Sequence, residues 1–331
     1  MKTRWPLIAV IFLLASCSGP GTSEVPVPPT DPPPAAPTQT EVAWTETPTL
    51  PPTEAPTDIP LPTNTALPAP TSTQAPQPTA PQTFQPGEAA IIARLERGPN
   101  AFYLVGGSQN GSWIGAGDQA ESISIHDEYQ IQTAFESQGW FTGEGFHQDP
   151  LCLTYYVDLE AVPITESVVG ISADWQIQPR TPLEVSVDQV VYKQALAAWL
   201  VAQAPSQPIV AINKIWRVDL EGNGSEEVLL NATHFAESTG HHVEARDYSV
   251  IFLRTVIGNE VVTKTIIGDF YAEAMEFRYP LTYILEFVGD LNGDGKMEVV
   301  VGVSGWERSG VMIYEIDLDQ VKLVLNVLCK L

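Results

Sequence analysis

The sequence predicts an α+β domain that is mainly antiparallel β, with one or two helices packed on it. Three observations lead to this fold class. Short runs rich in β-branched and aromatic residues dominate the second half, and residues 129–135 alternate apolar and polar, which is the spacing of a strand with one buried face. Helical spacing extends over one long segment, about 188–203. Helices and strands do not alternate along the chain, which argues against a doubly wound parallel sheet.

The chain begins with a short basic and apolar segment. Lys2 and Arg4 precede an apolar run at 7–14, which is too short to cross a bilayer, and Leu-Ala-Ser-Cys follows at 14–17. This order of features resembles the lipobox of bacterial lipoproteins. The resemblance implies that a signal peptide is cut before Cys17, that lipid on its sulfur anchors the protein in the cell membrane, and that the rest faces outside the cytoplasm. An ordinary secretory signal is the alternative.

Residues 18–88 differ sharply in composition from the rest of the chain. They contain 20 of its 29 prolines, many threonines and alanines, and no lysine or arginine. So few large apolar side chains cannot offset the entropy of ordering, so we expect a disordered, polyproline-like tether. The expected domains are a signal peptide with the lipidated cysteine at 1–17, the tether at 18–88 and a folded domain at 89–331, with possible subdomains at 89–185 and 186–331.

The charge of the folded part limits its partners. Residues 89–331 hold 33 of the 40 acidic residues and 14 of the 16 basic residues. This negative charge argues against nucleic acid and against docking on an anionic membrane surface, and it suits the binding of cations. We therefore expect contact with the membrane only through the lipid on Cys17. The other expected partner is an extracellular ligand or an envelope component.

The first half of the folded part is expected to begin with a helix. The pattern at 88–97 is helical and ends at a Gly-Pro pair. A strand at 101–105 follows, and the Asn-Gly pair at 110–111 predicts a hairpin, because both residues accept positive φ. The remaining elements expected here are an alternating strand at 129–135, a glycine- and aromatic-rich loop at 139–146 and a strand at 151–159.

The second half contains the long helix and most of the strands. Val191, Ala195 and Ala198 have helical spacing, and Ser186 with Gln189 forms a capping-box pattern. Strands are predicted after the helix at 209–218, 228–230, 248–256, 260–267, 281–288, 299–303, 311–316 and 321–327.

Two cysteines, Cys152 and Cys329, remain beyond Cys17. Export would place them in an oxidising compartment, so we expect one long-range disulfide between them. Two buried free thiols are the alternative.

The strongest chemical motif is an acidic loop between two predicted strands. Oxygen-bearing side chains stand at loop positions 1, 3, 5 and 9: Asp290, Asn292, Asp294 and Glu298. Such side chains on alternate residues of a tight loop can converge on one calcium ion. A weaker copy lies 71 residues earlier, with oxygen-bearing side chains at the same positions: Asp219, Glu221, Asn223 and Glu227. Two copies in equivalent contexts indicate an internal duplication.

Both loops resemble the calcium loops of FG-GAP and VCBS-type repeats, over two windows at about 213–230 and 284–303. The resemblance implies Ca²⁺ as the cofactor, with those four side chains of the second loop as ligands and the Lys296 carbonyl completing the loop. In the first loop Glu221 is longer than the usual residue and Asn223 carries no charge. Two loops are too few for a complete β-propeller. A plain turn is the alternative for each loop, because Asn-Gly and Asp-Gly form turns.

The sequence contains none of the common catalytic motifs, and whether the protein is an enzyme stays open. We expect a membrane-anchored surface lipoprotein with a calcium-stabilised, β-rich binding or structural module. A cell-surface hydrolase with a carboxylate active site is the alternative. Four aromatic residues are candidates for a sugar-binding platform, with core packing as the other interpretation: Trp113, Trp140, Phe141 and Trp306.

Overall fold

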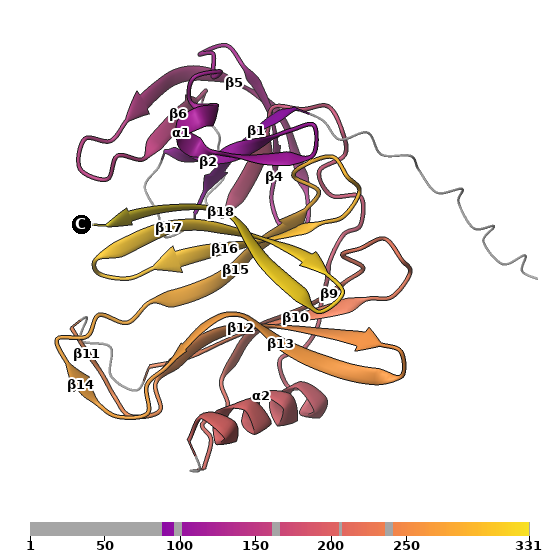
Figure 1. The fold of residues 1–331 in the computed structure, drawn as a ribbon, viewed down its shortest axis with the longest axis vertical. Helices are drawn as coiled ribbons and strands as arrows, with labels where there is room; N and C mark the ends of the chain where they lie inside the picture. Colours follow the sequence, from indigo (N-terminus) through magenta and orange to yellow (C-terminus); the bar gives the residue numbers. More distant parts are fainter. Residues whose placement is uncertain (1–87, 96–100, 161–165, 205–206, 236–240, 331) are drawn as a thin grey trace, which may run out of the picture. The chain divides into compact units, whose positions relative to one another are not determined.

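The computed structural model describes residues 88–95, 101–160, 166–204, 207–235 and 241–330 (Figure 1). All of them belong to one compact unit. The predicted signal peptide, the lipidated Cys17 and almost all of the predicted tether lie outside the described residues. No helix in the described part of the chain is long and apolar enough to span a membrane.

The first half of the unit forms a closed antiparallel sheet. Its strands are β1 (Ala89–Arg94), β2 (Phe102–Gln109), β3 (Ser112–Gly115), β4 (Glu128–Gln132), β5 (Ser137–Gln148), β6 (Tyr155–Leu159) and β7 (Val168–Ile171). Six strands pair in the order β1-β7-β4-β5-β6-β2, and β1 also pairs with β2, which closes the sheet into a barrel. Strand β3 extends β2 outside the closure, and the short helix α1 (Ala116–Gln119) follows it.

The second half forms two antiparallel meanders. The first has the order β13-β12-β10-β9-β8 and the second the order β15-β16-β17-β18. The strands are β8 (Leu183–Glu184), β9 (Ile212–Val218), β10 (Glu227–His234), β12 (Tyr248–Ile257), β13 (Glu260–Phe270), β15 (Thr282–Gly289), β16 (Glu298–Ser304), β17 (Arg308–Asp317) and β18 (Gln320–Lys330). A small pair, β11 (His242–Val243) and β14 (Met275–Glu276), lies beside the first meander, and helix α2 (Val190–Gln203) lies between β8 and β9 in the chain.

Apolar cores join these parts in layers, which Figure 1 shows from the barrel at the top to helix α2 at the bottom. One core joins the barrel to the second meander, through residues such as Tyr103 and Ile313. A second core lies between the two meanders, and a third joins α2 to the outer face of the first meander. The second meander is therefore covered on both faces, which explains its nearly continuous apolar strands.

The described residues are mostly antiparallel β, with two helices and no propeller, in agreement with the predicted class. The sequence does not predict the closed barrel. The hairpin at 110–111 is confirmed, since Asn110 and Gly111 have φ of 51° and 74°. The long helix is confirmed, but its capping box is wrong: Gln189 is the N-cap and makes no side-chain cap hydrogen bond.

Two elements differ from the sequence prediction. The expected helix at 88–97 is strand β1, whose first five residues are buried. Ile91 packs into the core against the second meander and Ile92 into the barrel interior, so both faces of the strand are apolar. A short apolar run of this kind has no periodicity that separates strand from helix. The expected loop at 139–146 is part of strand β5, where Gly145 makes room for the carboxylate of Asp158 on β6.

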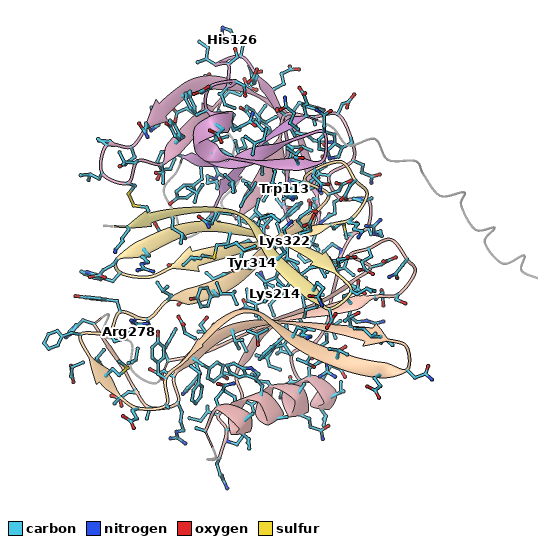
Figure 2. The ribbon with its side chains drawn as sticks, in the orientation of Figure 1. Trp113, His126, Lys214, Arg278, Tyr314 and Lys322 are labelled. Carbon is cyan, nitrogen blue, oxygen red and sulfur yellow. A yellow bond between two sulfur atoms is a disulfide. The ribbon has the colours of Figure 1, made fainter. Side chains whose placement is uncertain are left out.

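The structure brings Cys152 and Cys329 to disulfide distance, with the sulfur atoms 1.85 Å apart and the Cα atoms 4.7 Å apart (Figure 2). Cys152 lies in the turn between β5 and β6, and Cys329 lies on β18. The pair thus links the barrel to the second meander. A bond here closes a loop of 177 residues in sequence and limits the freedom of the unfolded chain.

Candidate functional site

The two acidic loops lie at corresponding turns of the two meanders. Loop 1 (219–227) joins β9 to β10, and loop 2 (290–298) joins β15 to β16. In both cases the glutamate at position 9 is the first residue of the following strand. Both loops therefore stand between two antiparallel strands that pair with each other.

The aspartate at position 1 organises loop 2. The Oδ1 atom of Asp290 accepts the backbone N–H groups of Gly293 (2.7 Å) and Asp294 (3.2 Å). Its Oδ2 atom accepts the N–H of Gly295 at 2.9 Å. Both glycines have positive φ, 77° and 85°, a conformation that a side chain would strain. One carboxylate thus holds the backbone of the whole tight turn.

Loop 1 repeats this arrangement bond for bond. The Oδ1 atom of Asp219 accepts the N–H groups of Gly222 (2.7 Å) and Asn223 (3.0 Å). Its Oδ2 atom accepts the N–H of Gly224 at 2.8 Å.

The glutamate at position 9 closes each loop in the same way. Glu227 accepts the N–H of Leu220 at 2.9 Å, and Glu298 accepts the N–H of Leu291 at 2.8 Å. The two loops therefore share one hydrogen-bond pattern.

Burial distinguishes the two loops. In loop 2, Asp290, Asn292 and Glu298 are 0%, 1% and 1% exposed. Among the polar side chains of loop 1, only Glu227 is comparably buried, and Asn223 is exposed to solvent. Loop 2 therefore holds its polar side chains in a much less aqueous environment.

Burial changes the acidity of the loop 2 carboxyls. It raises the pKa of Asp290 to about 6, although three backbone N–H groups favour the charged form. It also raises the pKa of Glu298 well above its usual value, and Asp294 adds to that rise. Asp290 therefore binds its proton more tightly in the folded chain than in the unfolded chain. Its contribution to the free energy of unfolding falls as the pH rises from about 4, the usual pKa, through about 6, the pKa in the folded chain. A cation in the loop would remove this penalty.

Two basic side chains lie at loop 2, but neither forms an ion pair with its carboxylates. Lys296 donates from Nζ to Asp317 at 3.0 Å, and Arg180 donates to the carbonyl of Gly295 at 2.8 Å. Within the described ranges, no lysine or arginine forms an ion pair with Asp290, Asp294 or Glu298. Carboxylate and amide oxygens are the ligands that calcium prefers, so the donor chemistry of loop 2 fits this ion.

The side chains are not gathered around a common centre in this structure. Among the described residues, no group of three or more His, Cys, Asp or Glu side chains is placed to hold a metal ion. The amide nitrogen of Asn292 donates to Asp294 at 3.2 Å, and the amide oxygen accepts the Asp294 N–H at 3.0 Å. Convergence on an ion would require Asn292 to turn its oxygen inward.

Loop 1 fits a cation less well. The Asn223 amide donates to Glu221 at 2.6 Å, and Glu221 also accepts the backbone N–H of Leu318 in the turn after β17. Its side chains are thus engaged with each other and with the neighbouring meander.

The segment after β7 connects the two loops. The sequence does not predict this connection. The guanidinium of Arg180 donates to the carbonyls of Asp219 and Leu220 in loop 1 and of Gly295 in loop 2, the last two at 3.1 and 2.8 Å. The N–H of Met297 also donates to Leu220 O at 2.8 Å. Because these acceptors are backbone carbonyls, no pattern of side chains in the sequence could reveal them.

The same segment fastens loop 2 at its start. The Asp290 N–H donates to Ile177 O at 2.6 Å, and the Trp175 indole donates to Asp290 O at 2.9 Å. Gln178 donates to Val288 O at 3.1 Å, just before the loop.

A large open groove lies on the barrel side of this segment. Its volume is about 1390 Å³. Residues from β2, α1, β4 and β5 line it together with 172–176 and with Gly293 of loop 2. His126, just before β4, is among the lining residues, and Figure 2 labels it at the top of the barrel. Loop 2 and the groove are therefore neighbouring parts of one region.

The four candidate aromatic residues do not form one platform. Trp140 lines the groove and is 47% exposed. Trp113 and Phe141 pack against apolar cores. Trp306 is 71% exposed and stacks on Tyr279, with ring centroids 6.4 Å apart. The groove instead combines Trp140 with Trp175, a residue that the sequence does not single out and that packs partly against the same core as Trp113.

No family model, curated protein or solved structure matches the chain.

Proposed function

We propose that this protein is a surface lipoprotein whose folded part is a calcium-stabilised binding module. Lipid on Cys17 holds it at the cell membrane, and residues 18–88 form a tether that lets the module reach beyond the surface. The observation that carries the calcium proposal is the buried acidic loop 2, whose carboxylates have no ion pair with a basic side chain in the described part of the chain.

The physical argument rests on the cost of buried charge. Asp290 and Glu298 are almost fully buried, and Asp294 lies in the same loop. Ionised carboxylates in such a place repel each other and lose hydration, which a divalent cation with oxygen ligands offsets. Asp290, Asn292, Asp294 and Glu298 would hold the ion by their side chains, and Lys296 by its carbonyl. Loop 1, with Asp219, Glu221, Asn223 and Glu227, would be the weaker site.

The alternative, a hydrolase with two facing carboxyls, finds less support. Among the residues that the structure describes, the carboxyls whose pKa is raised are those of Asp290, Glu298 and Glu227, and all three lie in the loops. Their oxygens accept backbone N–H groups of the same loops. A binding role is therefore the better proposal.

Calcium binding can be measured directly by equilibrium dialysis of the full chain. We expect about one calcium ion per chain at the tighter site, and Asp294→Asn to weaken it at least about tenfold, because the charge of the ligands sets the affinity. Asp317→Asn is the matched control. Asp317 is an exposed aspartate outside loop 2, and it pairs with the side chain of Lys296. Equal binding by wild type and Asp294→Asn would contradict the assignment of loop 2.

The membrane anchor is tested by Cys17→Ser. Serine cannot carry the thioether-linked lipid, so we expect the variant protein to leave the membrane fraction. Ser18→Ala, one residue further on, should leave the protein in the membrane. Retention of the Cys17→Ser chain in the membrane fraction to the wild-type extent would show that something else anchors the protein.

A further inference from the structure

We propose that the groove beside the barrel binds a neutral saccharide. This inference rests on the proposed function as a binding module, and it names the class of ligand. It does not depend on the lipid anchor, and its dependence on calcium can be tested separately.

The shape of the groove suits an extended ligand. A groove of about 1390 Å³ exceeds the usual range of sites for drug-sized molecules, which is roughly 300–1,000 Å³. Barrel residues line it together with residues 172–176, which follow β7, and Gly293 of loop 2. The groove is open rather than enclosed, so several units of a chain-like ligand can lie along it.

Two tryptophans provide apolar faces in the groove. Trp140, on β5, is 47% exposed. Trp175 also lines the groove and is partly packed against the core between the barrel and the second meander, and its hydrogen bond to Asp290 O at 2.9 Å fixes its indole. Aromatic rings present large, rigid apolar faces at low entropic cost, and the C–H faces of sugar rings pack against such surfaces.

The polar groups of the groove match sugar hydroxyls. Gln119 and Gln176 offer planar amides, and Asp127, Glu128 and Asp174 offer carboxylates. A carboxylate accepts two hydrogen bonds side by side, and a carboxamide accepts at its oxygen and donates from its nitrogen, so both groups can pair with adjacent hydroxyls of a sugar ring. A mixed lining of this kind favours a ligand with one apolar face and a polar edge.

The charge of the groove excludes acidic ligands. No lysine or arginine is among the described residues that line it, whereas Glu88, Asp127, Glu128 and Asp174 are acidic. Like charges repel nucleic acids and acidic glycans from such a surface. A neutral saccharide avoids this repulsion.

The groove and loop 2 share structural parts. Gly293 of loop 2 lines the groove, and Trp175 is bonded to the first residue of that loop. A calcium ion in loop 2 would therefore stiffen one wall of the groove. We expect saccharide binding to weaken when calcium is removed, without being abolished.

The test measures binding of the full chain to neutral oligosaccharides by titration calorimetry. The probes are hexamers of β-1,4-glucose, β-1,4-N-acetylglucosamine and α-1,4-glucose, and oligogalacturonate is the acidic control. We expect saturable binding to at least one neutral hexamer and none to the acidic one. Trp140→Ala should raise the Kd at least about tenfold, since one aromatic stacking contact carries energy of this order.

Trp306→Ala is the matched control, because Trp306 is also an exposed tryptophan but lies outside the groove. It should leave the Kd unchanged. Equal losses in Trp140→Ala and Trp306→Ala, binding to none of the neutral hexamers, or binding to oligolysine in their place would each overturn the saccharide proposal. Saccharide binding that persists while calcium binding is not detected would overturn the calcium proposal alone.

Discussion

Arg180→Ala is expected to lower the free energy of unfolding by about 3 kcal/mol. The half-buried guanidinium donates to three carbonyls, those of Asp219, Leu220 and Gly295, and so ties the two meanders together at their loops. Hydrogen bonds from charged donors each contribute roughly 1.5–3 kcal/mol. The loss is smaller than their sum, because water can donate to the carbonyls that Arg180 leaves behind. Urea unfolding at 25 °C, with and without the substitution, measures the loss.

Arg217→Ala is the matched control for this prediction. Arg217 is also an arginine close to loop 1, but it forms an exposed ion pair with Glu226. Pairs of this kind contribute roughly 0–1 kcal/mol. Arg180→Lys should fall between wild type and Arg180→Ala, because lysine keeps the charge but lacks the fork of donors. If Arg180→Ala and Arg217→Ala unfolded at the same urea concentration, the connecting role of Arg180 would be wrong.

Calcium is expected to raise the melting temperature by several degrees. An ion that binds only the folded chain stabilises it by RT ln(1 + [L]/Kd), which is about 2.7 kcal/mol at one hundred times Kd. For a domain of this size that corresponds to roughly 5–10 °C. Asp290→Asn should abolish the calcium-dependent part of the shift. Asparagine is preferable to alanine, because alanine would also remove every backbone hydrogen bond that Asp290 accepts.

Asp219→Asn supplies the control, since Asp219 makes the same hydrogen bonds in the more exposed loop 1. It should keep most of the calcium-dependent shift. Protons compete with calcium at Asp290, whose pKa burial raises to about 6, so the shift should shrink between pH 7 and pH 5. Identical melting of wild type and Asp290→Asn in calcium and in chelator would show that loop 2 is only a turn.

Sequence reasoning succeeded where structure depends on neighbouring residues. The hairpin at Asn110-Gly111 follows from two residues that accept positive φ. The existence of helix α2 is predicted correctly, although its buried residues are Leu196 and Leu200, whereas Val191 and Ala198 of the predicted apolar face are exposed. The acidic loops follow from the spacing of their oxygen-bearing side chains. This spacing is informative because the first aspartate binds backbone N–H groups only three to five residues away. In each case the determining contacts lie within one short stretch of the chain.

Sequence reasoning failed where distant segments decide the environment. Strand β1 was expected to be helical, because its apolar run is compatible with either structure until β2 and β7 pair with its two edges. The closure of the barrel follows from the same pairings. Residues 139–146, predicted as a loop, form part of strand β5, because β4 and β6 pair with its two edges.

By itself, the sequence determined the two acidic loops, the long helix, the mainly antiparallel class and the pair of cysteines available for a bond. Only the tertiary structure decided that loop 2 is buried while loop 1 is open, that Arg180 joins them, and that Trp140 and Trp175 face one groove. The physical reason is the range of the interactions. Turn and helix patterns arise from contacts a few residues apart, whereas burial, barrel closure and groove walls arise when segments about a hundred residues apart pack together.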